Sequence, residues 1–455
     1  MHHIEQVYIN GEFVTPHGTE RFDLYNPATA RVIGQVRLAD AVDGERAIAA
    51  ARAAFPAWSK ATKQMRIAAL QRMQAAVAAR HDDLLEAVVE EYGAPASRSA
   101  WMASYPAEVI AQAIAALEAF EFTTVAGAAR VEMTPLGVAG LITPWNSDAG
   151  FICGKLAAAL AAGCTAVIKP SEMSALQTQI VTEALHAADL PPGVFNIVTG
   201  RGDTVGETIS RHPHVAKISF TGSTRTGKAI LRNAAENFTR VTLELGGKSP
   251  TLILDDADIK QAIPLAVQAG LMNSGQACVA GTRILVPQSR KAEFEQALAL
   301  AVAAVASGDP RDAKTVVGPM VSERQWQRVQ GYIQKGLAEG ARLLAGGVGR
   351  PEGTRDGWFV RPTLFTDVHN QMAIARDEIF GPVLCVIAYR DEAEAIAIAN
   401  DTDYGLSALV LGGDSGRARR VAQQIQAGRV LVNTLTHEPK APFGGFKHSG
   451  VGREM

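Results

Sequence analysis

Short apolar runs alternate with helix-compatible segments through most of the chain. In a first series the apolar runs lie at 138–142, 166–168, 194–198, 215–220 and 241–245. A second series has runs at 251–254, 283–286, 383–388, 408–411 and 430–433. Strands that alternate with helices form parallel sheets with helices on their faces. We therefore predict an α/β fold of two abutting open parallel-sheet units that meet near residue 244.

The segments before this alternation have other patterns. Two short alternating runs flank Asn10 and Gly11, a dipeptide typical of hairpin turns. Residues 41–118 are rich in alanine and have helical periodicity interrupted by prolines and glycines, so several helices are expected there. Residues 119–135 predict a further small hairpin, which is either an association arm or an ordinary edge hairpin.

The composition is that of a soluble globular protein and excludes several function classes. Of 455 residues, 47% are hydrophobic and 20% are charged, close to ordinary values. The formal net charge is -2 and no basic block is present, which argues against a nucleic-acid partner. The N-terminus lacks the layout of a signal peptide, and polar residues interrupt the most apolar segment. We therefore expect a cytoplasmic protein with no membrane partner.

Of the four cysteines, one has chemically suggestive surroundings. No two cysteines have the spacing of a C-x-x-C pair or a metal site, so no metal is predicted. Cys164 and Cys385 lie in apolar runs, where cysteine behaves as a small core residue. Cys278 instead ends the polar segment Asn273-Ser274-Gly275-Gln276-Ala277-Cys278. It is the candidate nucleophile.

Two polar residues at strand ends complete a candidate reaction centre. Glu244 follows an apolar run at the junction of the two predicted units, where pockets form in α/β proteins, and is a candidate base. Asn146 follows the run at 138–142, and its amide is a neutral donor suited to a developing oxyanion. The alternative interpretation of Asn146 is an ordinary cap of the next helix.

Three more polar segments at strand boundaries suit a nucleotide. Lys169 and Glu172 suit the hydroxyls of a ribose, although Ser171 and Glu172 are also typical of a helix start. Residues 220–227 form a strand, a glycine turn and a helix start, which suits a pyrophosphate. Residues 378–380 place a carboxylate and an aromatic ring before a strand, where the ring is equally explained as part of the core.

In order and approximate spacing, these segments resemble the motifs of the aldehyde dehydrogenase superfamily over nearly the whole chain. The matching segments are Pro144-Trp145-Asn146, Lys169-Pro170-Ser171-Glu172, Phe220-Thr221-Gly222-Ser223, Glu244-Leu245-Gly246-Gly247-Lys248, Gly275-Gln276-Ala277-Cys278, Glu378-Ile379-Phe380-Gly381-Pro382 and Pro442-Phe443-Gly444-Gly445-Phe446-Lys447-His448-Ser449-Gly450. The resemblance implies that Cys278 attacks an aldehyde carbon and that Asn146 and the Cys278 backbone N–H stabilise the oxyanion. Glu244 then activates the water that releases a carboxylic acid from a thioester.

The resemblance also implies a nicotinamide cofactor in a Rossmann-like domain. It places the adenosine ribose on Lys169 and Glu172, the pyrophosphate near Ser223 and the nicotinamide ribose on Glu378. The full implied cofactor set is Thr143, Trp145, Lys169, Ser171, Glu172, Gly222, Ser223, Gln325, Glu378 and Phe380. Because the carboxylate of Glu172 repels the extra phosphate of NADP, NAD is the expected cofactor, with NADP a possible second one.

Substrate contacts are implied near the reaction centre. They are Ser147, Phe151, Ala277, Val279, His437 and Phe443. Many relatives place an aromatic residue directly after the oxyanion asparagine, whereas this chain has Ser147. We therefore expect a wider or more polar aldehyde tunnel, with Trp101 and Tyr105 as further wall candidates. His437 also has the simpler interpretation of a solvated loop histidine.

The resemblance divides the chain into functional regions. They are a cofactor-binding domain at 1–118 and 136–244, an oligomerisation hairpin at 119–135, a catalytic domain at 245–435 and a return segment at 436–455. A homodimer or homotetramer is expected. Relatives usually continue beyond the position of Met455 with a strand that pairs in the oligomer, so the hairpin is expected to expose strand edges.

Two other functions share much of this pattern. A relative that passes the acyl group to coenzyme A has the same nucleophile, but Glu244 argues against it because a hydrolytic base destroys the thioester. A retired relative with a binding or structural role has the same fold, but it need not keep Cys278, Glu244 and Asn146 together. The sequence does not indicate the physiological aldehyde.

Overall fold

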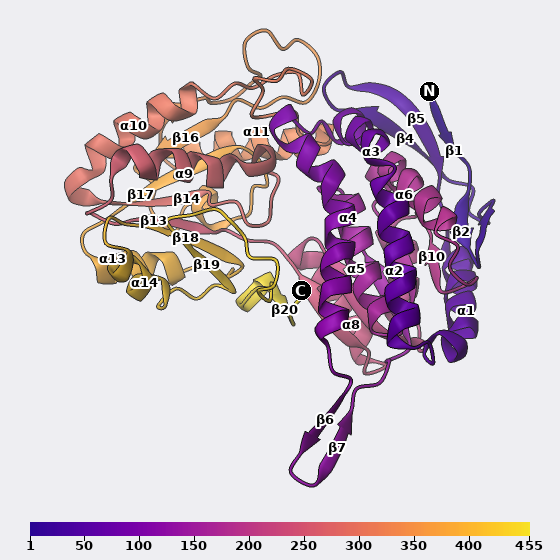
Figure 1. Cartoon of the computed structure of the whole chain (residues 1–455). Helices are drawn as coiled ribbons and strands as arrows, with labels where there is room; N and C mark the ends of the chain where they lie inside the picture. The colour runs from indigo at the N-terminus through magenta and orange to yellow at the C-terminus, as the bar shows by residue number, and fades with distance from the viewer.

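The computed structural model describes residues 1–455 as two α/β units that lie side by side, with a two-stranded hairpin projecting away from them (Figure 1). The predicted α/β class with two parallel-sheet units is confirmed. The C-terminus lies between the two units (Figure 1). The last residues of the chain therefore reach the seam at which the candidate base was predicted.

The first unit is built on an eight-stranded sheet in the order β20-β12-β11-β8-β9-β10-β2-β3. The strands from β12 to β10 pair in parallel, whereas β20, β2 and β3 pair antiparallel at the two edges. The strands are β2 (Val7–Ile9), β3 (Glu12–Val14), β8 (Val138–Ile142), β9 (Thr165–Lys169), β10 (Phe195–Ile197), β11 (Val215–Thr221), β12 (Arg240–Glu244) and β20 (Gly450–Val451). The helices are α1 (Ala41–Trp58), α2 (Lys63–Ala78), α3 (His81–Ala87), α4 (Ala96–Ala119), α5 (Asp148–Ala161), α6 (Ala175–Ala187), α7 (Glu207–Arg211) and α8 (Thr224–Ala235).

The second unit is built on a seven-stranded sheet in the order β15-β16-β17-β14-β13-β18-β19. All neighbours are parallel except the edge strand β15. The strands are β13 (Pro250–Ile253), β14 (Arg283–Pro287), β15 (Arg342–Ala345), β16 (Thr363–Thr366), β17 (Val383–Tyr389), β18 (Ser407–Leu411) and β19 (Arg429–Val432). The helices are α9 (Ile259–Leu271), α10 (Lys291–Ala303), α11 (Glu323–Ala338), α12 (Ala373–Arg376), α13 (Glu392–Asn400) and α14 (Ser415–Ala422).

The central strands are continuous apolar runs because helices cover both faces of each sheet. Every residue of β8, β9, β13 and β14 is buried. A strand buried on both faces needs apolar residues at successive positions rather than at alternate ones. This requirement explains why the runs of the two series predicted these strands closely.

Several elements carry no such run and were not predicted. A three-stranded sheet in the order β1-β5-β4 is formed by β1 (His2–Ile4), β4 (Arg21–Asn26) and β5 (Arg31–Arg37). These strands are partly exposed and contain charged residues, so they form no apolar run. Residues Gly202–Gly206 form a single π turn directly before the short helix α7.

The hairpin consists of β6 (Thr123–Ala126) and β7 (Ala129–Glu132). All eight of its residues are exposed, and Val125 keeps 78% of its surface accessible.

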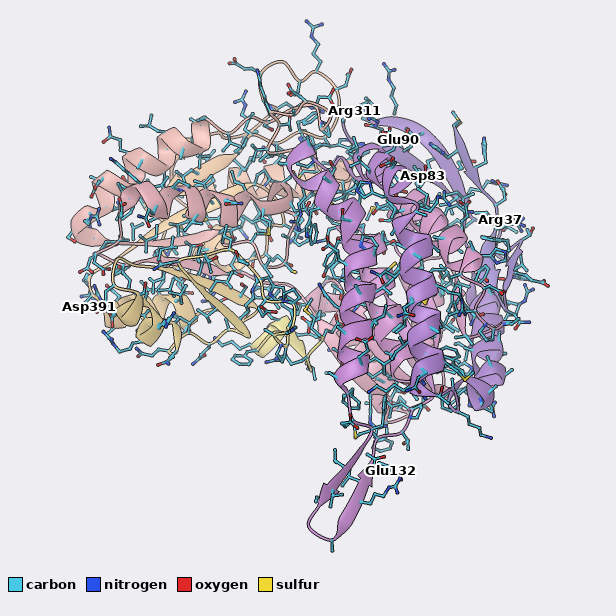
Figure 2. The ribbon with its side chains drawn as sticks, in the orientation of Figure 1. Arg37, Asp83, Glu90, Glu132, Arg311 and Asp391 are labelled. Carbon is cyan, nitrogen blue, oxygen red and sulfur yellow. The ribbon has the colours of Figure 1, made fainter.

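Figure 2 shows charged side chains at the periphery of the molecule, among them Glu132 on the hairpin and Asp391 on the second unit. No helix combines the length and the apolar character that crossing a membrane requires.

Candidate active site

The segment before Cys278 is held in an unusual backbone conformation. Asn273, Ser274 and Gly275 have φ values of 53°, 58° and 73°, so three consecutive residues are left-handed. Non-glycine residues in this region are strained and persist only where their surroundings fix them. Here the Ser274 hydroxyl accepts from the Gly318 N–H at 2.9 Å. The turn brings Ala277, Cys278 and Val279 out of a buried loop into half-exposed positions.

Asn146 is bound to this same loop. Its Nδ2 donates to the Gln276 carbonyl at 3.0 Å, and the Asn273 amide donates to the Asn146 carbonyl at 3.2 Å. The helix-cap alternative for Asn146 is wrong, because Ser147 occupies the N-cap of α5 and no side chain caps that helix. A primary amide has two N–H donors, and one of those in Asn146 has no protein acceptor. That donor is free for an oxyanion.

Glu244 is the last residue of β12 and is only 4% exposed. Neither of its carboxyl oxygens has a hydrogen-bond partner in the protein. A Cβ placed on Gly444 would stand 2.8 Å from Glu244 Oε1, so the return segment packs directly against the carboxyl group. Burial, reinforced by the negative charge of Glu454, raises the pKa of Glu244 to about 8. Glu244 can therefore act as a base near neutral pH.

The Cys278 thiol lies within electrostatic range of Glu244. A Cβ placed on Gly247, three residues after Glu244, would stand 2.4 Å from the Cys278 carbonyl oxygen. Burial raises the pKa of Cys278 to about 12, with contributions from the charges of Glu378 and Glu244, whereas Arg429 opposes the shift. Because the thiolate and the Glu244 carboxylate repel each other, their ionisations are coupled and one negative charge is favoured over two.

The pKa of Glu244 predicts the pH dependence of the step in which it acts as a base. A carboxyl group accepts a proton only when it is deprotonated, so with Glu244 as the candidate base we expect the breakdown rate of the acylated enzyme to rise with pH and to level off above about 8. Quenched-flow measurement of acid release between pH 6 and 9 checks this prediction. A flat profile across that range would show that Glu244 is not the titrating base.

The sequence analysis missed an ion pair behind Glu244. Lys155 Nζ lies 2.5 Å from Glu454 Oε1 and donates to the Ser219 hydroxyl at 2.8 Å. Burial alone would raise the pKa of Glu454, but the charge and hydrogen bond of Lys155 keep it below its usual value. The pair thus fixes a negative charge next to Glu244. The only available signal was a single lysine in the apolar segment that became α5.

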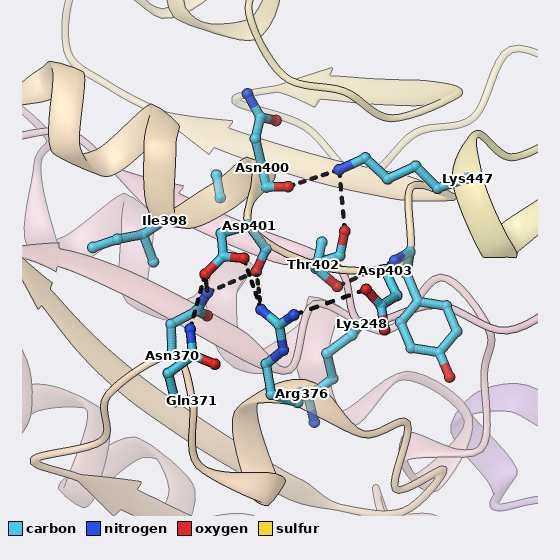
Figure 3. Close-up of polar contacts among 12 residues, drawn as sticks. Lys248, Asn370, Gln371, Arg376, Ile398, Asn400, Asp401, Thr402, Asp403 and Lys447 are labelled. Carbon is cyan, nitrogen blue, oxygen red and sulfur yellow. Dashed lines mark hydrogen bonds and ion pairs between the residues drawn. The ribbon is translucent and has the colours of Figure 1, made fainter.

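A network in the second unit anchors the return segment that packs on Glu244 (Figure 3). Lys447 Nζ donates to the carbonyls of Asn400 and Thr402 at 2.7 and 3.1 Å. Arg376 Nη1 pairs with Asp401 Oδ1 at 2.9 Å and holds the same loop (Figure 3). The segment that carries Gly444 is therefore tied to the unit built on the seven-stranded sheet.

The residues implied for an adenosine ribose form one charged cluster. Lys169 Nζ lies 3.4 Å from Glu172 Oε2, and Arg201 Nη1 lies 3.2 Å from Glu172 Oε1. The Ser171 hydroxyl accepts from the Met173 N–H at 3.3 Å and so caps the short turn that carries Glu172. The helix-start interpretation of this segment is confirmed, and the same turn presents the Glu172 carboxylate between two cations.

The glycine turn at 220–227 ends at the start of α8. Ser223 is the N-cap of this 12-residue helix, and its hydroxyl accepts from the Thr226 N–H at 3.3 Å. The first turn contains no acidic residue, which leaves the positive end of the helix open to an anion. A Cβ on Gly222 would stand 2.5 Å from the Phe220 ring, so any side chain at this position would displace that ring. The turn fits a pyrophosphate group.

The remaining implied cofactor residues lie in two places. Glu378 Oε1 accepts from the Gly247 N–H at 2.9 Å, and Gln325 Nε2 donates to the Phe380 carbonyl at 2.7 Å. The rings of Trp145 and Phe380 meet edge to face with centroids 5.4 Å apart, and both residues are only partly buried. The Thr143 hydroxyl is buried and donates to Asp148 Oδ1 at 2.6 Å, which gives it a role in holding the start of α5.

The residues implied for substrate contact lie on three elements around Cys278. Ser147 and Phe151, at the start of α5, are half-exposed, and the wall candidate Tyr105 packs against Gly150 between them. Ala277 and Val279 flank Cys278, the candidate nucleophile. The rings of His437 and Phe443 meet edge to face at 6.0 Å. His437 is half-buried, and its Nε2 lies 3.4 Å from Met455 Sδ, so it is not a freely solvated loop residue.

An α/β protein with a thiol, an amide donor and a buried carboxyl group at the seam of two sheets has the parts of a cysteine-dependent enzyme. The sequence matches the aldehyde dehydrogenase family over residues 13–455. A putative aldehyde dehydrogenase of Staphylococcus haemolyticus is 44% identical over 456 aligned residues, which cover 100% of this chain and 96% of that protein. The 3-succinoylsemialdehyde-pyridine dehydrogenase of a Pseudomonas species is 43% identical with the same coverage.

Solved structures agree with the sequence comparisons. Aldehyde dehydrogenase C of Pseudomonas syringae, solved as a cysteine-to-alanine mutant with NAD+ and octanal, is 45% identical with a TM-score of 0.97 and coverage of 99% and 93%. The Mycobacterium tuberculosis aldehyde dehydrogenase bound to NAD+ is 39% identical with a TM-score of 0.96 and coverage of 99% and 95%. This chain belongs to the aldehyde dehydrogenase family.

Proposed function

We propose that this protein oxidises an aldehyde to the carboxylic acid, with NAD as the hydride acceptor and a thioester on Cys278 as the intermediate. The observation that carries the proposal is the convergence of Cys278, the Asn146 amide and the unpaired carboxyl group of Glu244 on one seam. The relatives solved with NAD+, one of them also with octanal, support the same chemistry.

The reaction begins when the Cys278 thiol loses its proton to solvent and the resulting thiolate attacks the aldehyde carbon, which forms a C–S bond and turns the carbonyl oxygen into an alkoxide. The free N–H of Asn146 and the backbone N–H of Cys278 stabilise this negative charge. Bound NAD supplies the acceptor for the hydride that leaves the adduct carbon. Glu244 then removes a proton from water as the water attacks the thioester, so the acid is released and the Cys278 sulfur is regenerated.

We propose that the unit built on the eight-stranded sheet holds the cofactor. Lys169, Glu172 and Arg201 lie where they can bind the adenosine ribose, and Gly222 and Ser223 begin the anion-accepting end of α8. Trp145, Gln325, Glu378 and Phe380 complete the nicotinamide side, with Thr143 and Ser171 as supporting residues.

Glu172 is expected to set the preference for NAD over NADP. In Glu172→Ser, Lys169 and Arg201 lose their shared carboxylate and can bind the 2′-phosphate of NADP instead. We expect the ratio of kcat/KM for NADP to that for NAD to rise by about 10–100-fold. Steady-state kinetics with both cofactors and one aldehyde check the change.

Glu20→Ser is the matched control for this prediction. Glu20 pairs with the same Arg201 guanidinium at 2.7 Å but lies on the exposed side. Its removal should leave the cofactor ratio nearly unchanged. Equal ratios in wild type and Glu172→Ser would contradict the proposed placement of the ribose.

We also propose a cytoplasmic homodimer or homotetramer in which the hairpin of β6 and β7 makes a subunit contact. The hairpin is completely exposed, including the apolar Val125, which supports a role in subunit contact. All four cysteines are unpaired, which suits a reducing compartment. Sedimentation of wild type against a variant with residues 123–132 replaced by a short turn tests it. An unchanged mass in the shortened variant would contradict the proposed contact.

The test of the proposed function is NAD reduction over a panel of aliphatic, aromatic and carboxylated aldehydes. Aldehyde-dependent absorbance of reduced nicotinamide without coenzyme A is expected. An absolute requirement for coenzyme A would favour the acyl-transferring alternative, which the placement of Glu244 disfavours. Absence of both NAD binding and turnover would favour a retired relative.

A further inference from the structure

Arg429 is a charged residue beside the nucleophile that none of the steps above uses. It begins β19 and pairs in register with Ser407 of β18. The backbone N–H of Arg429 donates to the Leu406 carbonyl at 3.1 Å. A Cβ placed on Gly247 would stand 3.4 Å from Leu406 Cβ and 2.4 Å from the Cys278 carbonyl oxygen. Arg429 therefore lies in the layer that directly supports Cys278.

The Arg429 guanidinium is half-buried but poorly satisfied. Its Nε and Nη2 both donate to one hydroxyl oxygen, Ser407 Oγ, at 3.2 and 3.1 Å. Its Nη1 donates to no protein atom, and the group forms no ion pair. A guanidinium carries five N–H donors in a planar fork, so several of them remain available.

A structural arginine in the same unit shows the contrast. Arg283 is fully buried, and its donors are taken up by the carbonyls of Lys248, Ile398 and Ala399 and by the Asn370 side chain. Arg283 thus needs no further partner. Arg429 differs because the Ser407 hydroxyl is the only protein acceptor of its guanidinium, and no carboxylate balances its charge.

The Arg429 guanidinium also lies over a proposed substrate contact. The guanidinium carbon is 5.6 Å from the centre of the Phe443 ring, and Phe443 directly precedes Gly444, which packs on Glu244. Cys278 and Glu244 act on the same substrate carbon in the proposed mechanism. A group bound to Arg429 is therefore close to the reacting end of the substrate and in contact with the same aromatic wall.

We propose that Arg429 is a specificity-determining residue that binds a carboxylate on the substrate, so that the preferred substrates are short aldehydes with an acid group at the other end. This inference rests on the proposed function. A carboxylate matches the planar fork of a guanidinium and supplies the missing counter-charge. A neutral aldehyde of the same length leaves both the charge and its free donors unpaired.

The test compares 4-oxobutanoate with butanal, which has the same carbon chain without the acid group. For wild type, kcat/KM is expected to be higher for 4-oxobutanoate. Arg429→Gln should lower the ratio of the two kcat/KM values by about 10–100-fold, whereas Arg429→Lys should retain much of it. Arg420→Gln, on the exposed face of α14, is the control and should leave the ratio unchanged.

The ratio separates recognition from other roles of Arg429. If Arg429 acted only on the Cys278 thiol, its replacement would lower kcat/KM for both aldehydes by the same factor. The ratio of the two kcat/KM values would then stay unchanged. A ratio unaffected by Arg429→Gln, or a wild-type preference for butanal, would overturn the inference. If wild type oxidises neither aldehyde, nor any other in the panel, the proposed function itself fails and the inference fails with it.

A second measurement needs no variant, in case Arg429→Gln does not fold. Succinate should inhibit the oxidation of butanal by wild type competitively, whereas succinamide, of nearly the same shape but uncharged, should inhibit at least about 10-fold more weakly. Equal inhibition by the two compounds would contradict a carboxylate site at Arg429.

Discussion

Replacing Cys278 with alanine is expected to reduce aldehyde-dependent NADH formation by at least about 10³-fold. Without the sulfur no adduct forms, and a hydride leaves a free aldehyde far less readily than a tetrahedral alkoxide. The fold should be retained, because Cys278 is half-exposed and its loop is held by Ser274 and Gln276 rather than by the thiol. Stopped-flow absorbance of reduced nicotinamide measures the loss.

Cys164→Ala is the matched control, since it also removes a thiol but from the core of the first unit. It should keep near wild-type turnover even if its thermal stability falls. NAD affinity measured by calorimetry should be unchanged in Cys278→Ala. Turnover of Cys278→Ala within about tenfold of wild type would refute the assignment of the nucleophile.

Replacing Glu244 with glutamine is expected to separate the two halves of the reaction. Adduct formation and hydride loss need Cys278 and Asn146, whereas water attack needs the Glu244 carboxylate. The variant should therefore give a burst of one reduced cofactor per active site, followed by steady-state turnover about 10²–10⁴-fold slower than wild type. Rapid mixing with an excess of aldehyde and NAD measures both phases.

Glu236→Gln, at the exposed end of α8, is the control for this variant and should show wild-type turnover. Loss of the burst together with the steady state in Glu244→Gln would mean that Glu244 also activates the thiol. Steady-state turnover equal to wild type would exclude it as the hydrolytic base.

The fold could be predicted where burial alone determines the sequence. Strand β8 is covered on both faces, and it is a continuous apolar run. Strands with an exposed face or a charged edge, such as β5, lack that signal and were missed. Strand β20 is only two residues long, and its pairing with β12 depends on a return of the chain across the whole molecule.

The candidate site residues could be predicted where their neighbours in the sequence distinguish them from core residues. Cys278 stands in a polar loop, and Glu244 and Asn146 each follow a buried strand, so their neighbours distinguish them from core residues. Arg429 and the pair of Lys155 with Glu454 have no such neighbours. Each acquires its role from residues far away in the chain, and only the packing of the two units brings those residues together.

The central claim is that Cys278 makes a covalent bond that Glu244 is needed to break. The direct measurement is intact and peptide mass spectrometry of Glu244→Gln quenched after reaction with butanal and NAD. The account predicts a mass increase of one butanoyl group in place of hydrogen, located on the peptide that contains Cys278 and absent when NAD is omitted. An unmodified Cys278 peptide after a full burst of reduced cofactor would contradict it.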